Sequence, residues 1–281
     1  MTSAEVAAKS VKVGGFEIGA GKPLAVIAGP CVIEGRDPAL RHAEFLKNAA
    51  DRIGLPFIYK SSYDKANRTS LSSYRGLGLE KGLEILREVK EKVGVPILTD
   101  VHEQEQIAAV KQVADILQIP AFLCRQTDFV VAVARSGNIV NVKKGQFLAP
   151  WDLRHVVDKI VSTGNEQVLV TERGVCFGYN NLVSDMRSLA ILRDVGYPVV
   201  FDATHSLQLP GGRGNASGGE RKFIAPLARA GVAVGVDALF MEVHEDPDRA
   251  LSDGPNSLPL REVEELWRLA KEIDSLVKER A

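Results

Sequence analysis

Short apolar runs rich in β-branched residues recur along the chain, and glycine or proline residues bound most of them. Runs of this length, without strict alternation of polar residues, are typical of strands buried on both faces of a sheet. Strands are predicted at residues 24–30, 57–62, 96–101, 116–122, 139–145, 168–174, 199–205 and 238–244. A continuous parallel sheet is therefore expected.

The segments between these runs repeat apolar residues at intervals of three and four, with charged residues at the remaining positions. This spacing predicts amphipathic helices. Two such stripes are Leu79, Leu83, Leu86 and Val89, and Leu182, Met186, Leu189 and Leu192. Because each parallel strand needs a crossover to the next, eight strand–helix units predict an α/β fold of the (β/α)8 TIM-barrel type. A doubly wound open sheet is the main alternative.

Both ends of the chain add to this pattern. Residues 11–20 alternate apolar and polar side chains around Gly14 and Gly15, which predicts an N-terminal β-hairpin that closes the barrel floor. A helix from about residue 260 to 278 carries an apolar stripe for packing on the barrel or on a partner subunit. We find no low-complexity linker, so a single barrel domain over residues 1–281 is expected.

Composition narrows the possible partners. The chain has 35 Lys and Arg residues against 36 Asp and Glu residues, so no general attraction to nucleic acid or to an anionic membrane is expected. No apolar stretch approaches the roughly 20 residues of a membrane span, and the first residues lack a signal-peptide layout. The three cysteines suggest no disulfide framework, which favours a cytoplasmic protein with free thiols.

Candidate chemistry lies where the predicted strands end. In a TIM barrel the carboxyl ends of the strands form the active face. These ends carry Cys31, Lys60, Asp100, Gln118, Lys143, Arg173, His205 and Glu242. The three cations among them, in a chain without a basic excess, predict a local site for an anionic ligand.

A metal site is predicted from barrel closure, because the eighth strand then lies beside the first. Closure would bring together Cys31, His205 and Glu242, with Asp253 reaching them from the following loop. A thiolate, an imidazole and carboxylates suit zinc, iron(II) or manganese better than magnesium or calcium.

These residues also have other interpretations. Cys31 could be a small buried apolar residue or a nucleophile activated by His205. His205 could instead bind a backbone carbonyl, and His244 is a possible substitute metal ligand because it shares a strand face with Glu242.

Three further features have open readings. Asp100 could bind sugar hydroxyls, or cap the following helix with Glu103 as its partner. The glycine-rich stretch 209–220 predicts a mobile lid, with an idle surface loop as the alternative. Cys124 and Cys176 lie past the fourth and sixth strands and are interpreted as structural.

Several strings, in order and spacing, resemble the 3-deoxy-D-manno-octulosonate-8-phosphate synthase family, also called 2-dehydro-3-deoxyphosphooctonate aldolases. They are AGPCVIE, YKSSYDKANRTS, YRGLGLEKGL, ILTDVHE, LQIPAFLCRQTD, NVKKGQFLAP, TERG, FDATHSLQLPGG and SDGPNSLPL. The KANR string distinguishes this family from the related heptulosonate synthases, which typically have KPR there. The resemblance runs from about residue 22 to the C-terminus.

The resemblance implies a reaction between phosphoenolpyruvate and arabinose 5-phosphate in Kdo and lipopolysaccharide biosynthesis. It implies that Lys143, Arg173 and the backbone near Ala121 hold the phosphate of phosphoenolpyruvate. Its carboxylate and reacting end would lie near Lys60, Lys65 and Gln118. The other expected substrate-binding residues are Ser62, Asn67, Arg68 and Thr69, with Asp100 at the sugar hydroxyls.

The resemblance also implies a catalytic set, a metal class and an assembly. Lys60, Lys65, Asp100 and His205 are the expected catalytic residues. Family members with cysteine after AGP use a divalent metal, so Cys31, His205, Glu242 and Asp253 are its expected ligands. A homotetramer is expected, in which Arg125 reaches the sugar phosphate of a neighbouring subunit. Heptulosonate synthesis from erythrose 4-phosphate and a non-catalytic sugar-phosphate sensor are the alternatives.

Overall fold

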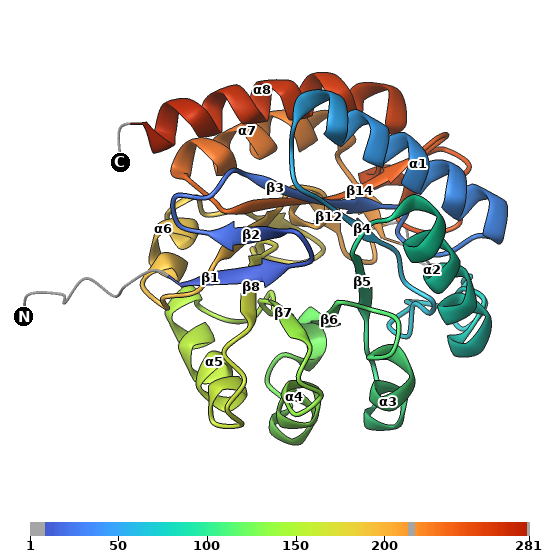
Figure 1. Cartoon of the computed structure of the whole chain (residues 1–281), viewed down its shortest axis with the longest axis horizontal. Helices are drawn as coiled ribbons and strands as arrows, with labels where there is room; N and C mark the ends of the chain where they lie inside the picture. The colour runs from blue at the N-terminus through green and yellow to red at the C-terminus, as the bar shows by residue number, and fades with distance from the viewer. Residues whose placement is uncertain (1–8, 213–216, 280–281) are drawn as a thin grey trace, which may run out of the picture.

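The computed structural model describes residues 9–212 and 217–279 and has a closed barrel of parallel strands at its centre (Figure 1). The barrel strands are β3 (Ala25–Gly29), β4 (Phe57–Lys60), β5 (Ile97–Asp100), β6 (Ile116–Ile119), β7 (Ile139–Lys143), β8 (Val168–Glu172), β11 (Val199–Asp202) and β14 (Ala238–His244). Strand β14 pairs in parallel with both β3 and β11, which closes the sheet. The predicted (β/α)8 TIM barrel is therefore confirmed.

Helices follow the strands and surround them. They are α1 (Arg36–Ile53), α2 (Leu79–Val93), α3 (Ile107–Val110), α4 (Thr127–Ala134), α5 (Leu153–Val161), α6 (Arg187–Arg193), α7 (Ile224–Val234) and α8 (Leu260–Lys278). Figure 1 shows α8, in red, against α1 and α7. The predicted C-terminal helix is confirmed, and its apolar stripe buries Val263 and Trp267.

The N-terminal hairpin is confirmed as well. Strands β1 (Ser10–Val13) and β2 (Phe16–Gly19) pair antiparallel around a turn at residues 14 and 15. Val11, Val13 and Ile18 are fully buried and join the apolar cluster that fills the lower barrel. The hairpin therefore packs as a plug against the barrel interior.

Two predictions of local structure were wrong. The strands β4, β6, β7, β8 and β11 end two or three residues earlier than expected, because the chain turns into loops after the last ladder pairs. Leu182 does not begin a helix but lies in β10 (Leu182–Val183), which pairs with β9 (Val175–Cys176). A single buried leucine in a hairpin can extend an apolar spacing that only later becomes helical.

The barrel interior changes character along its axis because side chains of a strand alternate between its two faces. Ile58, Leu98, Ile116 and Leu169 belong to the apolar cluster of the lower interior. Two residues further along the same strands, on the same face, stand Lys60, Asp100, Gln118 and Thr171. The upper interior is therefore polar, and the next two-residue step leads into the active-face loops.

Among the described residues, no helix combines the length and the hydropathy that a membrane span requires.

Candidate active site

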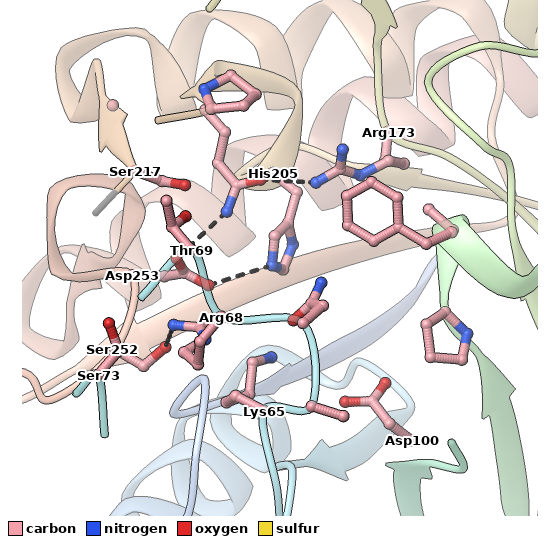
Figure 2. Close-up of a pocket in the computed structure, with 18 of the residues that line it drawn as sticks. Lys65, Arg68, Thr69, Ser73, Asp100, Arg173, His205, Ser217, Ser252 and Asp253 are labelled. Carbon is pink, nitrogen blue, oxygen red and sulfur yellow. Dashed lines mark hydrogen bonds and ion pairs between the residues drawn. The ribbon is translucent and has the colours of Figure 1, made fainter. Parts of the chain in front are cut away.

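A cavity of about 960 Å³ opens over the polar half of the barrel. Its wall includes most of the predicted site residues: Lys60, Lys65, Asn67, Arg68, Thr69, Asp100, Gln118, Ala121, Lys143, Arg173, His205 and Asp253. Figure 2 shows Lys65, Asp100, Arg173 and His205 directed toward a common space. Residues from nearly every strand end thus converge on one site.

Four other predicted residues lie outside this wall. Ser62, Cys31 and Glu242 are buried next to it, through contacts with Asp100, Asp253 and Lys60 respectively. Arg125 is exposed on the surface and does not line the cavity of its own chain.

The Asp100 carboxylate is a hydrogen-bond acceptor facing the cavity, and it does not cap a helix. It accepts hydrogen bonds from the Ser62 hydroxyl and the Gln118 amide. Burial raises its pKa, but the charges of Lys60 and Lys65 outweigh burial and hold the pKa well below the ordinary value. Glu103, not Asp100, caps the short helix η1 (Gln104–Gln106), so the capping alternative was wrong.

Lys143 and Arg173 form a cationic pair at the β7 and β8 ends of the cavity. Lys143 Nζ lies 3.7 Å from the centre of the Phe240 ring and forms an ion pair with Asp202. One Arg173 nitrogen donates to Gln208 at 2.7 Å, while its Nη1 is buried and has no hydrogen-bond partner among the described residues. Burial lowers the pKa of both side chains, and Asp202 opposes this shift. An unpaired buried guanidinium donor indicates an anionic ligand at this end.

Asp202 is a site residue that the sequence analysis missed. Its Oδ2 lies 2.7 Å from His205 Nδ1, and its Oδ1 accepts from the backbone N–H of His205 at 2.8 Å. This carboxylate therefore fixes the imidazole and leaves Nε2 directed toward Glu242 and Asp253. A signal was available, because Asp202 lies two residues after Val200 and therefore on the same, inward face of the strand.

The proposed metal ligands are brought together pairwise. Cys31 Sγ lies 3.0 Å from Asp253 Oδ2, and His205 Nε2 lies 3.5 Å from Glu242 Oε1 and 3.8 Å from Asp253 Oδ2. Donor atoms bound to one ion at about 2.0–2.3 Å are themselves roughly 3–4 Å apart. Within residues 9–212 and 217–279, however, no three such side chains have the combined arrangement of a formed metal site.

The contacts of Glu242 explain why the predicted ligands lie close together in pairs without forming a metal site. Lys60 Nζ forms a buried ion pair of 2.8 Å with Glu242 Oε1, which occupies one oxygen of the carboxylate. In the part of the chain that the structure describes, Glu242 Oε2 is buried and has no hydrogen-bond partner, and a cation would satisfy such a carboxylate oxygen. The donor set therefore fits a divalent metal, although its side chains are not drawn into a coordination shell.

Cys31 does not have the surroundings of an activated nucleophile. Burial and the neighbouring Asp253 raise the pKa of its thiol to about 12. A reactive cysteine needs the opposite shift. His244 does not join the cluster, since its Nε2 lies 3.4 Å from Glu34 and its Nδ1 accepts from Asp246. Cys124 is buried as predicted for a structural residue, whereas Cys176 is exposed.

Two loops close the outer side of the site. Asp253 adopts a left-handed backbone with φ of 50°, an unusual conformation for a residue other than glycine. Arg68 Nη1 donates to Ser252 at 2.7 Å, and Gln208 Nε2 donates to Asp253 Oδ1 at 3.2 Å (Figure 2). Gln208 therefore connects Arg173 with Asp253, and no function had been predicted for it, because the glycine-rich stretch begins at residue 209.

The predicted lid at 209–220 lies partly outside the described residues. Its two flanks, β12 (Gln208–Leu209) and β13 (Gly218–Gly219), pair antiparallel beside the cavity. Residues 213–216 fall outside the described ranges, so mobility of the lid stays a prediction.

Comparison with known proteins identifies the family of this chain. The model of the DAHP synthetase I family matches residues 4–279. A 2-dehydro-3-deoxyphosphooctonate aldolase of Trichlorobacter lovleyi is 58% identical over 270 residues, covering 96% of this chain and 99% of the relative. Proteins of the same name from Methylococcus capsulatus and Acidithiobacillus ferrooxidans are 60% and 62% identical over 278 and 264 residues. They cover 99% and 94% of this chain, and 98% and 94% of their own lengths.

The family expected from KANR and the other strings is thus confirmed, and the chain belongs to the DAHP synthetase I family, alongside its 2-dehydro-3-deoxyphosphooctonate aldolases.

Proposed function

We propose that this protein condenses phosphoenolpyruvate, arabinose 5-phosphate and water into 3-deoxy-D-manno-octulosonate 8-phosphate and inorganic phosphate, for Kdo and lipopolysaccharide biosynthesis. The observation that carries the proposal is one cavity of about 960 Å³ with two separate groups of cations on its wall. Lys60, Lys65, Lys143 and Arg173 form the inner group, and Arg68 and Arg221 form the outer group on the loops. Two groups of cations can bind two small anions in one cavity. Family membership supports phosphoenolpyruvate and arabinose 5-phosphate as these anions.

The residues divide between the two substrates. Lys143 and Arg173 bind the phosphate of phosphoenolpyruvate, with the unpaired Nη1 of Arg173 as a ready donor. Lys60 and Lys65 lie on the side of its carboxylate. The outer segment with Asn67, Arg68 and Thr69 binds the phosphate of arabinose 5-phosphate, and Asp100 accepts hydrogen bonds from its hydroxyls. Holding both anions converts a bimolecular encounter into an oriented reaction.

The chemistry follows from this placement. Carbon 3 of phosphoenolpyruvate attacks the aldehyde carbon, and the developing alkoxide takes a proton supplied from the side of Lys60 and Lys65. Water adds to carbon 2, after which the carbon–oxygen bond to phosphate breaks and the ketone forms. Lys143 and Arg173 stabilise the departing phosphate charge.

We further propose that Cys31, His205, Glu242 and Asp253 hold a divalent metal such as zinc, iron(II) or manganese. The support is the mixed donor set, the buried Glu242 Oε2 without a partner, and the hold of Asp202 on His205 Nδ1. A bound ion of this kind would polarise a carbonyl oxygen or lower the pKa of a water molecule.

The proposal includes a cytoplasmic homotetramer. The three cysteines are free thiols, as a reducing compartment favours. Exposed aromatic side chains gather on the loops after β6, β7 and β8: Phe122, Phe147, Trp151, Phe177 and Tyr179. We call this set the aromatic rim. Arg125 is exposed on one of the same loops, so a second copy seated on the rim would receive it near its own site.

Substrate choice is tested by comparing phosphate release from phosphoenolpyruvate with arabinose 5-phosphate or erythrose 4-phosphate as the aldose. We expect a higher kcat/KM for the five-carbon sugar. Preference for erythrose 4-phosphate would instead support heptulosonate synthesis, and binding of either sugar phosphate without phosphate release would support a sensor.

Metal dependence is tested by elemental analysis of the purified protein, followed by chelation and addition of zinc, iron(II) or manganese. We expect about one bound divalent ion per chain, loss of activity on its removal and recovery on its return. A Cys31→Ala variant should contain less metal than a Cys124→Ala control. Full activity in verified metal-free protein would contradict the proposal.

A further inference from the structure

A buried chain of hydrogen bonds crosses the upper barrel from β8 to β5, beneath the cavity floor. The Thr171 hydroxyl donates to Asn141 Oδ1 at 2.6 Å, and Asn141 Nδ2 donates to Gln118 Oε1 at 2.8 Å. The Gln118 amide then donates to Asp100 Oδ1. Thr171 and Asn141 are fully buried and do not line the cavity, whereas Gln118 and Asp100 do.

We propose that Thr171 and Asn141 are positioning residues for arabinose 5-phosphate, because they fix the orientation in which Gln118 and Asp100 meet the sugar hydroxyls. The proposal rests on the function proposed above. It adds two residues that touch no substrate. It also assigns Gln118 to recognition of the sugar, because its amide donates to Asp100, whereas the resemblance had placed Gln118 beside the carboxylate and reacting end of phosphoenolpyruvate.

The direction of the chain follows from the carboxylate at its end. An ionised Asp100 only accepts hydrogen bonds, so the Gln118 side chain must turn its NH2 group toward it. Gln118 then presents its carbonyl oxygen to Asn141, so Asn141 must donate a hydrogen bond from its own NH2 group. This leaves Asn141 Oδ1 facing Thr171. The last residue must therefore be a donor, and a hydroxyl meets this requirement.

Without the chain, the Gln118 amide has no fixed orientation. Rotation by half a turn would place its carbonyl oxygen against the Asp100 carboxylate, two acceptors in contact. With the chain intact, Asp100 and Gln118 offer the cavity an acceptor and a donor side by side. A sugar hydroxyl both donates and accepts, so this pair is suited to hold one in a single orientation.

The barrel architecture explains why these residues form a unit. Asn141 pairs with Gln118 in the register of β6 and β7, and Thr171 stands opposite Lys143 in the register of β7 and β8. Asn141 and Lys143 lie on the same face of β7, two residues apart. From Asp100 to Asn141 the chain therefore follows ladder partners, and at Thr171 it moves two residues along β8, to the position opposite Lys143.

The test compares Thr171→Val, which keeps the shape of the side chain but removes the donor, with Thr171→Ser, which restores a hydroxyl. For Thr171→Val we expect KM for arabinose 5-phosphate to rise about tenfold, with KM for phosphoenolpyruvate within about twofold of wild type. Thr171→Ser should return KM for the sugar to within about threefold of wild type.

Thr99→Val is the matched control. Thr99 is a fully buried barrel threonine whose hydroxyl donates to the Ser61 carbonyl at 2.8 Å, outside the chain to Asp100. Removal of the Thr99 hydroxyl should lower Tm by about as much as Thr171→Val does, without raising KM for the sugar. An unchanged sugar KM in Thr171→Val, an equal rise for both substrates, or failure of Thr171→Ser to recover would overturn the proposal.

Failure of the proposed enzymatic function can be distinguished from failure of the positioning proposal. A wild-type protein inactive on phosphoenolpyruvate and arabinose 5-phosphate would refute that function alone. The chain itself would then be tested by the side-chain NH2 resonances of Asn141 and Gln118. Slow hydrogen exchange of both in wild type, and faster exchange in Thr171→Val but not in Thr99→Val, would support it. Fast exchange in wild type would overturn it.

Discussion

At the residue scale, the site is built from buried charges held in place by buried partners. Asp202 illustrates this, because a single carboxylate contacts Lys143 on the anion-binding side and His205 on the proposed metal side. Because Asp202 contacts both side chains, a shift of Lys143 would also shift His205. Neither contact is visible as a motif, since Asp202 belongs to the string FDATH for which only the histidine had been assigned a function.

Replacement of Asp202 by asparagine should lower kcat and metal content together, each roughly 10–100-fold, as outer ligand partners typically do. The measurement is steady-state kinetics paired with elemental analysis. Asp237→Asn is the control, because Asp237 is also a buried aspartate, and it accepts a hydrogen bond from the Val199 backbone at 2.8 Å away from the cavity. A normal kcat in Asp202→Asn would contradict the function proposed for Asp202.

The Asp100 carboxylate predicts a pH dependence of stability. In the folded protein the pKa of this carboxyl group lies well below the ordinary aspartate value of 3.8, because the attraction of Lys60 and Lys65 outweighs burial. The ionised group thus stabilises the fold above about pH 4, and that contribution is lost as the pH falls further. Asp100→Asn should cost about 1–3 kcal/mol at neutral pH, and the difference should shrink below about pH 4 in thermal unfolding. A constant difference down to pH 3 would contradict the assignment.

At the element scale, the antiparallel pair of β12 and β13, which we call the ribbon, holds site residues that lie beyond the barrel strands. Strand β13 lies directly against η6 (Gly254–Asn256), the short helix that follows Asp253. A Cβ atom built on Gly219 would fall 1.3 Å from Asn256 Oδ1, so a larger residue requires either the buried Asn256 side chain or β13 to move. The ribbon carries Gln208, which joins Arg173 to Asp253.

Gly219→Ala should therefore displace the ribbon and weaken both contacts of Gln208. We expect KM for phosphoenolpyruvate to rise about tenfold, because Arg173 loses a fixed partner. Gly15→Ala, where an added Cβ meets no atom within 4 Å, should leave the kinetics unchanged. Equal kinetics of the two variants would mean that the ribbon does not support the site.

The hairpin of β1 and β2 contributes stability and not chemistry. Ile18 is fully buried in the cluster that fills the lower barrel. Ile18→Ala should cost about 2–5 kcal/mol in denaturant unfolding, since it removes buried methyl groups and leaves a cavity. Leu276→Ala on α8, where the side chain is 56% exposed, should change stability by less than about 0.5 kcal/mol. A small loss for Ile18 would mean that the hairpin does not act as a plug.

At the scale of the whole molecule, the aromatic rim predicts how copies assemble. Phe177 is 70% exposed, and a monomer rarely leaves so many aromatic side chains uncovered on neighbouring loops. Phe177→Asp should shift the proposed tetramer toward smaller species in sedimentation velocity. Leu276→Asp, on a helix away from these loops, should not. A tetramer that persists in Phe177→Asp would place the interface elsewhere.

The sequence by itself determined the barrel, the hairpin, the C-terminal helix and most of the cavity wall. These follow from local periodicity and from one global constraint, closure of eight parallel strands, which also predicted that Cys31, Glu242 and His205 would be neighbours. Strand ends were less accurate, because ladder pairing between strands decides where each one stops.

Only the tertiary structure decided which polar residues act together. Asp202 with Lys143, Gln208 with Arg173, and Thr171 with Asn141 are contacts between different strands or loops. The alternation of a strand tells which way a side chain points, but a hydrogen bond across the barrel depends on register, tilt and side-chain orientation, which one chain segment does not encode alone. The sequence therefore identified the residues of the site, and the fold decided their partners.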